Sequence, residues 1–130
     1  MASIVELREK SDRALEEMME NAREEMFNLR FQNASARLAD VSRIRAVRRE
    51  LAQLTTVLKM RRLAIESAAK QPEIDSVLSG QEWSATAHFS YEESAWKVEF
   101  EGENGKELIS TYINLNKKRV KGRRIRRLAR

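Results

Sequence analysis

The sequence predicts an α+β fold: a long antiparallel two-helix hairpin, then a small three-stranded antiparallel β-meander and a basic tail. Three observations support it. Apolar residues recur every three or four positions in the first half of the chain, they alternate with polar residues in two later stretches, and nine cations without a carboxylate fill the last fourteen positions. The expected parts are a helical hairpin at 1–70, a linker at 71–82, an acidic meander at 83–116 and a basic tail at 117–130.

Charge is divided unevenly among these parts, although the net charge of the chain is only +5. Residues 1–70 hold 14 basic and 11 acidic residues, residues 71–116 hold 2 and 9, and residues 117–130 hold 9 and none. The cations of the tail repel one another unless a polyanion lies nearby. Nucleic acid is therefore the expected partner.

The composition of the chain argues against catalytic, cofactor-binding and metal-binding sites. A chain of 130 residues in an elongated shape buries too little surface for a deep catalytic cleft. There is no cysteine, and the sequence contains no phosphate-binding glycine loop and no serine elbow. The only histidine, His88, stands between Ala87 and Phe89 and is expected on the polar face of a strand. We expect no enzyme activity, no cofactor, no metal and no small-molecule substrate.

No apolar stretch approaches the roughly 18 residues of a membrane span, and the first charge comes at the sixth position. A cytoplasmic protein without a membrane partner is expected.

The first long helix is predicted from an apolar stripe with spacings of four and three residues. Ser11 is a plausible N-cap, and Asp12 places a negative charge in the first turn, where the helix dipole favours it. The helix should begin near residue 12. The stripe consists of Leu15, Met19, Ala22, Met26 and Leu29.

A second stripe predicts a helix over about 41–68, with Asp40 placed to cap its first amides. Only residues 34–40 separate the two stripes, and so short a connection favours an antiparallel hairpin. Pro72 should close the second helix and start the linker. The second stripe consists of Ile44, Val47, Leu51, Leu54 and Leu58.

The meander is predicted from alternation at 83–91 and 96–100 and from Asn104-Gly105, which favours a type I′ hairpin turn before a third strand at about 107–115. The apolar face of so few strands needs a cover, from a helix, another protein or RNA. Two turns of two and four residues set the expected pairs: Phe100 with Ile109, Val98 with Thr111, Trp96 with Ile113, Tyr91 with Trp96 and Phe89 with Val98.

The remaining chemistry is cationic. Four arginines open the second helix, and the spacing of three of them, at 45, 48 and 49, places their side chains within about one turn on one side. Guanidinium groups match phosphates well, but an exposed helix can also carry arginines only as a solvated surface. From the residues alone both interpretations stay open. The cluster consists of Arg43, Arg45, Arg48 and Arg49.

Two motifs resemble the bacterial large-subunit ribosomal protein L-twenty-nine (L29) family. They are EEMFNLRFQ at 24–32 and RIRAVRRELAQL at 43–54, which occur in the family's order and separation on the two predicted helices. The similarity runs from about Val5 to about Arg62. It implies a helical hairpin on the large subunit, in contact with large-subunit rRNA near the exit of the peptide tunnel and beside ribosomal protein L-twenty-three.

The resemblance implies an RNA-facing set on both helices. Phe27 and Phe31 have two open interpretations, contact with a partner or packing of the hairpin end. The implied set is Asn28, Arg30 and Gln32 on the first helix and Arg43, Arg45, Arg48 and Arg49 on the second, with Lys59, Arg61 and Arg62 as weaker members.

Three features depart from the family. Gln53 and Thr55 stand where basic residues are common, and Ala36 stands at a turn position where glycine is common, so a left-handed backbone there would carry a cost. The family also usually ends soon after the second helix, so residues 71–130 are an extension about which the resemblance says nothing.

The tail, KKRVKGRRIRR at 117–127 with three further residues at its end, resembles the basic extensions by which ribosomal proteins enter rRNA. A nuclear-localisation signal and a solubilising end are the alternatives. Its candidate RNA-binding residues are Lys117, Lys118, Arg119, Lys121, Arg123, Arg124, Arg126, Arg127 and Arg130.

Together these features predict a structural constituent of the large ribosomal subunit. Its partners would be rRNA, neighbouring ribosomal proteins and nascent-chain factors at the tunnel exit. The alternative is a free-standing coiled-coil RNA-binding or interaction module outside the ribosome.

Overall fold

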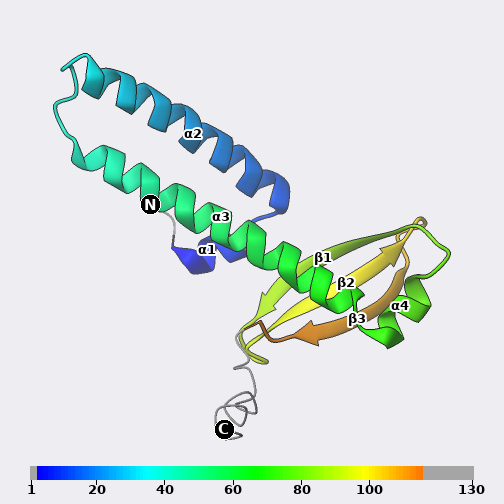
Figure 1. Ribbon diagram of the computed structural model, residues 1–130. Helices are drawn as coiled ribbons and strands as arrows, with labels where there is room; N and C mark the ends of the chain where they lie inside the picture. Colours follow the sequence, from blue (N-terminus) through cyan, green and yellow to red (C-terminus); the bar gives the residue numbers. More distant parts are fainter. Residues whose placement is uncertain (1–2, 116–130) are drawn as a thin grey trace, which may run out of the picture.

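The computed structural model describes residues 3–115, and in them the α+β class and the three-stranded antiparallel sheet are confirmed. Helices α2 and α3 lie side by side and run in opposite directions, and the far end of α3 lies against the sheet (Figure 1). The predicted basic tail falls outside the described residues. The elements are α1 (Ile4–Glu9), α2 (Asp12–Ala34), α3 (Ser42–Ala69), α4 (Pro72–Leu78), β1 (Trp83–Ser90), β2 (Ala95–Gly102) and β3 (Glu107–Ile113).

Helix α2 begins as its sequence predicts. The hydroxyl of Ser11 accepts a hydrogen bond from the amide of Ala14 at 3.3 Å, so Ser11 is the N-cap. Helix α1 was not predicted, because six residues are too few for a periodic pattern. It is held by a capping box between Ser3 and Glu6, and it buries Leu7 against the hairpin.

The predicted stripes form the seam between α2 and α3. Leu15 and Leu54 are fully buried with Leu7 in one cluster, and Met26 and Val47 are buried in a second cluster nearer the hairpin loop. Burying each such side chain contributes roughly 1.5–3 kcal/mol, so the seam supplies a large favourable contribution to the stability of the hairpin.

Helix α3 begins at Ser42, one residue later than expected, with Val41 at the N-cap position. Asp40 still binds the first turn: its carboxylate accepts hydrogen bonds from the amide of Ser42 at 3.0 Å and from the Ser42 hydroxyl. The hydroxyl hydrogen bond, followed by the amide one, lowers the pKa of Asp40.

The connection between α2 and α3 contains a residue in a left-handed backbone conformation. Ala36 has a φ of 57°, as its place at a turn position favoured by glycine suggested. A Cβ atom in this region costs about 1 kcal/mol because it crowds the backbone. We therefore expect Ala36→Gly to raise the free energy of unfolding by about 1 kcal/mol in urea titrations.

Ala39→Gly is the matched control, since Ala39 lies in the same connection at a negative φ. There the added chain freedom of glycine should lower stability by a few tenths of a kcal/mol. Equal effects of the two substitutions would contradict the strain at Ala36.

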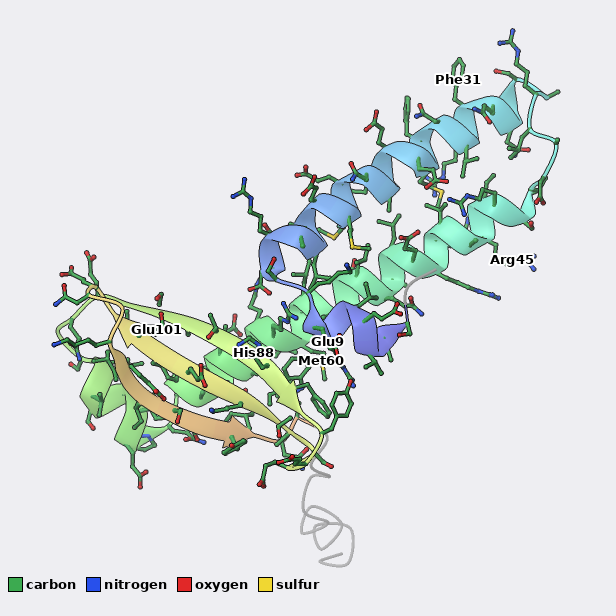
Figure 2. All side chains as sticks on the ribbon, turned by 180° about the vertical axis from the view of Figure 1, so that it is seen from behind. Glu9, Phe31, Arg45, Met60, His88 and Glu101 are labelled. Atoms are coloured by element: carbon green, nitrogen blue, oxygen red, sulfur yellow. The ribbon has the colours of Figure 1, made fainter. Side chains whose placement is uncertain are left out.

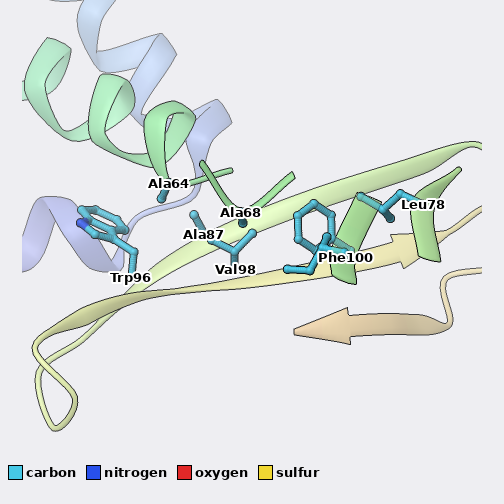
Figure 3. Close-up of a cluster of buried hydrophobic side chains, with 8 residues drawn as sticks. Ala64, Ala68, Leu78, Ala87, Trp96, Val98 and Phe100 are labelled. Atoms are coloured by element: carbon cyan, nitrogen blue, oxygen red, sulfur yellow. The ribbon is translucent and has the colours of Figure 1, made fainter. Parts of the chain in front are cut away.

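The apolar face of the sheet is covered by the chain itself. Ala64 and Ala68 from the last turns of α3 and Leu78 from α4 pack against Val98 and Phe100 (Figure 3). The small alanine side chains let the helix approach the sheet closely. Of the three possible covers named above, a helix is the one found.

The segment expected as a linker, 71–82, is partly helical. Pro72 closes α3, as predicted, and also stands in the first turn of α4, where its missing N–H removes no hydrogen bond. Helix α4 then buries Ile74 in the core shared by α3 and the sheet. The meander is thus attached to the hairpin through a common core rather than through a free linker.

The predicted pairing of β2 with β3 is confirmed at Phe100–Ile109, Val98–Thr111 and Trp96–Ile113. The predicted type I′ turn is wrong. Such a turn needs a positive φ at both Asn104 and Gly105, and of these two only Gly105 has one, of 70°. The amide of Gly105 donates to the carbonyl of Gly102 at 3.0 Å. The loop therefore has three residues, and a bulge between Phe100 and Glu101 restores the expected register beyond it.

The predicted pairing of β1 with β2 is off by two residues. Phe89 pairs with Trp96 and Ala87 with Val98, because the four-residue turn is 91–94 rather than 92–95. Tyr91 belongs to this turn, which Ser94 completes with a φ of 50°. A shift by two keeps every side chain on its predicted face, so the alternation could not reveal the error.

Candidate RNA-binding surface

Three arginines of the predicted cluster form one exposed surface at the start of α3. Arg45, Arg48 and Arg49 are all exposed, and none of them makes an ion pair with any other residue in 3–115. Figure 2 shows Arg45 pointing away from α2, toward the outside of the hairpin. This side of the hairpin end is open to a polyanion.

Arg43 is different from the other three. Its guanidinium lies 2.5 Å from a carboxylate oxygen of Glu25 and ties α3 to α2. The side chain is still 53% exposed, but its charge is neutralised within the hairpin. It can contribute less than its neighbours to an anion-binding surface.

The motif residues of α2 are exposed as well, on another side of the hairpin. Phe27 and Phe31 are 70% and 63% exposed, so the idea that they pack the hairpin end is wrong. Figure 2 shows Phe31 pointing away from α3. Asn28 and Gln32 line a shallow hollow together with carboxylates of α2, whereas Arg30 is exposed outside it.

Lys59 and Arg62 lie farther along α3. Both are exposed and line a groove of about 720 Å³ between α2 and α3, whose walls include the carboxylates of Glu16 and Glu66. Fourteen residues separate Arg45 from Lys59, which is about 21 Å along a helix and almost a whole number of turns. The two cationic groups are thus well separated, and Arg62 lies toward the groove rather than on the outer side of α3.

Between these two cationic groups lie Gln53 and Thr55, the two positions where basic residues are common in the family that the sequence resembles. Gln53 is half-buried, and its side-chain oxygen is buried without a hydrogen-bond partner. The hydroxyl of Thr55 donates to the carbonyl of Leu51 at 2.8 Å. Neither position offers a cation in the middle of the helix.

Arg61 does not belong to the RNA-facing set. It is only 5% exposed, and its guanidinium donates to the carbonyls of Arg8 and Lys10 at 2.8 and 2.7 Å and pairs with Asp12. The sequence contained a usable signal: Arg61 lies seven residues after the buried Leu54, a spacing that puts both on one stripe. The sequence predicted Arg61 as an RNA contact, but its guanidinium is occupied inside the hairpin.

A second arginine has a role that the sequence did not suggest. The guanidinium of Arg8 lies 4.3 Å from the centre of the Phe89 ring and donates to the hydroxyl of Tyr91 at 3.3 Å. Because Arg61 holds the carbonyl of Arg8, this contact joins α1, α3 and β1. No sequence pattern links positions so far apart.

Other chemistry finds little support in the part of the chain that the structure describes. No group of three carboxylate, histidine or cysteine side chains is placed to hold a metal ion there. His88 is exposed, as expected, and pairs across the strands with Lys97. No helix in residues 3–115 is long and apolar enough to cross a membrane.

Comparison with known proteins places the similarity on the hairpin. The model of the family described as "Ribosomal L29 protein" matches residues 5–61, from α1 to within α3. "Large ribosomal subunit protein uL29" of Mycolicibacterium vanbaalenii is 48% identical over 60 residues, which are 46% of this chain and 78% of that protein. Its namesake in Mycobacterium ulcerans is 41% identical over 68 residues, 52% of this chain and 85% of that protein. Helix α4 and the sheet lie beyond the matched family model.

Proposed function

This chain belongs to the Ribosomal L29 protein family, and from that premise we propose that it is a structural constituent of the large ribosomal subunit. It binds large-subunit rRNA near the exit of the peptide tunnel, in the cytoplasm. The observation that supports this proposal best is the unpaired, exposed group of Arg45, Arg48 and Arg49 at the end of the hairpin.

Electrostatics allows this surface to act independently of the acidic sheet. Arg45 and Ala68, where α3 meets the sheet, are 23 residues apart, which is about 35 Å along a helix. The Debye length is about 8 Å at physiological ionic strength, so the carboxylates of the meander hardly weaken the potential at the arginines. Each neutralised phosphate then releases counterions and adds affinity that does not depend on sequence.

The two sides of the hairpin end suit different neighbours. The arginine side of α3 faces phosphates. The α2 side carries exposed phenylalanines beside Glu24 and Glu25, a combination that suits a protein surface better than phosphates. We propose that this side contacts a neighbouring ribosomal protein, L-twenty-three, and that Asn28, Arg30 and Gln32 lie at the boundary between protein and RNA. Nascent-chain factors at the tunnel exit would then approach the same region.

The rRNA proposal is tested with the triple variant Arg45→Gln, Arg48→Gln, Arg49→Gln. Glutamine keeps the helix but removes three phosphate contacts, so the slope of log affinity for a large-subunit rRNA fragment against log salt should flatten by about 2–3. Fluorescence anisotropy at several salt concentrations measures this slope.

The matched control is Arg13→Gln, Lys70→Gln, Lys106→Gln, which removes the same charge from exposed positions away from the hairpin end. Its salt slope should stay close to that of the original chain. If both triple variants flatten the slope equally, the arginine cluster is not the binding surface.

The competing proposal, a free-standing interaction module, predicts a different distribution in cells. A ribosomal constituent is present in purified large subunits at one copy per subunit and stays bound when the subunits are washed in moderate salt. Its absence from washed subunits, or a level far below one copy, would favour the free module.

The tail at 117–130 remains a proposed second RNA anchor. Deleting it should lower affinity for rRNA and flatten the salt slope further, because up to nine cations are removed. The same anisotropy titrations measure this, with the arginine variants as reference. An unchanged slope would leave the tail as a localisation signal or a solubilising end.

A further inference from the structure

One edge of the sheet offers backbone hydrogen-bonding groups to a partner. The strand order β1-β2-β3 leaves β1 paired on one side only. Along an antiparallel strand the backbone groups of successive residues point alternately to the two neighbouring strands. Half of the N–H and C=O groups of β1 must therefore point away from β2.

The strand register identifies the residues whose backbone groups point outward. The amide of Gly102 donates to the carbonyl of Lys106, so the backbone groups of Gly102 point toward β3. Because the direction alternates along β2, the backbone groups of Glu101 and Glu99, one and three residues away, point toward β1. Their partners there are Thr86 and Ser84. The backbone groups that point outward are thus those of the alternate residues of β1, which are Trp83, Ala85, Ala87 and Phe89. Within residues 3–115, no backbone hydrogen bond outside the β1–β2 pairing involves them.

This edge lacks the features that usually protect an edge strand. Its eight residues include no charged side chain apart from the titratable His88, no proline and no bulge. The other edge, β3, begins with Glu107 and contains the bulge opposite Phe100 and Glu101. The edge is most open at Trp83 and Ala85, whereas Ala87 is buried and the guanidinium of Arg8 lies over the ring of Phe89. A regular edge strand of this kind is a template for a further strand.

Charge selects the kind of segment that can pair there. Glu82 precedes β1, Glu92 and Glu93 follow it, and all three are exposed. Two cations lie near the strand: Lys97 is paired with Glu99 at 2.8 Å, and Arg8 lies over the ring of Phe89 and donates to Tyr91. Carboxylates at both ends of an uncharged strand complement a segment whose ends are basic.

We propose that β1 receives an extended segment of another protein as a fourth strand, with lysine or arginine flanking an uncharged, alternating centre. This goes beyond rRNA binding, since it uses the acidic end of the molecule and a different class of partner.

A second copy of this chain is a poor occupant. In the register centred on Ala87, which pairs almost the whole strand, two copies related by a two-fold axis would set Glu82 of one copy opposite Glu92 of the other at both ends. Like charges directly opposite one another destabilise a strand pair.

Amide hydrogen exchange on the full chain, followed by NMR, tests the proposal. The probe is the peptide Lys-Lys-Val-Thr-Val-Thr-Val-Lys-Lys. In the free protein the amide of Ala85 should exchange quickly, whereas that of Thr86, which pairs with Glu99, should be protected. A saturating amount of the probe should slow exchange at Ala85 about tenfold or more. The same peptide with glutamate in place of lysine should leave this rate unchanged.

Two matched variants locate the site. Thr86 and Ser110 are both exposed and flank Glu99 in one row across the sheet, one on each edge strand. Thr86→Lys should weaken binding of the basic probe about fivefold or more, whereas Ser110→Lys should change it less than twofold.

Several results would overturn the proposal. Protection at Ala85 that rises with protein concentration would identify a second copy as the occupant. Protection in the free chain that disappears when residues 117–130 are deleted would identify the tail. Equal binding of both peptides, or protection on β3 instead, would remove the basis of the proposal. None of these results bears on the titrations of the arginine variants with rRNA, so the two proposals fail separately.

Discussion

Replacing Arg61 with methionine is expected to lower the free energy of unfolding by about 3 kcal/mol. The substitution leaves the carbonyls of Arg8 and Lys10 without their donor in a partly buried place and removes the ion pair to Asp12. An unmade hydrogen bond to a buried group costs about 1–3 kcal/mol, and methionine recovers only the packing of the side-chain stem. Urea unfolding followed by circular dichroism measures the loss.

Arg61→Lys separates geometry from charge. A single ammonium group cannot reproduce the fork that reaches two carbonyls and a carboxylate, so this variant should also be destabilised, by more than half as much. Arg62→Met, at an exposed neighbouring position, should change stability by less than about 0.5 kcal/mol. If Arg61→Met were as mild as Arg62→Met, the role assigned to the buried guanidinium would be wrong.

Replacing Phe100 with alanine is expected to cost about 3–5 kcal/mol, the usual range for a buried phenylalanine. Phe100 is fully buried in the centre of the core that α3, α4 and the sheet share, and its ring meets that of Trp83 edge to face at 5.3 Å. Thermal unfolding measures the total loss. Tyr112→Ala, at a half-exposed aromatic on the outer face of the same sheet, is the control and should cost far less.

The loss at Phe100 should also be local. The core around Phe100 shares no buried residue with the two clusters of the α2–α3 seam. Hydrogen exchange should therefore accelerate in the sheet, in α4 and in the last turns of α3, while the amides around Leu15 and Val47 stay protected. Equal acceleration in both regions would show that the hairpin depends on the extension for its stability.

These expectations follow from the way the extension is attached. The family match ends at residue 61, yet α3 continues without a break to Ala69 and supplies Ala64 and Ala68 to the second core. Arg8 adds a contact from α1 to Phe89. The meander is therefore joined to the hairpin by a continuous helix and a shared core, at the end opposite to the arginine cluster.

Local patterns were sufficient for much of this protein. The spacing of Leu15 and Leu54 with their neighbours identified both long helices, the hydroxyl of Ser11 marked the start of one of them, and alternation identified the strands and their buried face. Each of these features depends on residues close together in the chain, where periodicity and capping act directly. The motifs at 24–32 and 43–54 carried the family in the same way.

Contacts between distant segments decided the rest. Whether Arg61 faces solvent or two carbonyls depends on where the connection between α1 and α2 lies, and whether Phe31 packs or stays exposed depends on the angle at which α2 meets α3. The cover of the sheet and the partner of Arg8 depend on segments many residues away in the chain. Periodicity reports only which face of an element is apolar, and it takes the packed molecule to show what that face meets.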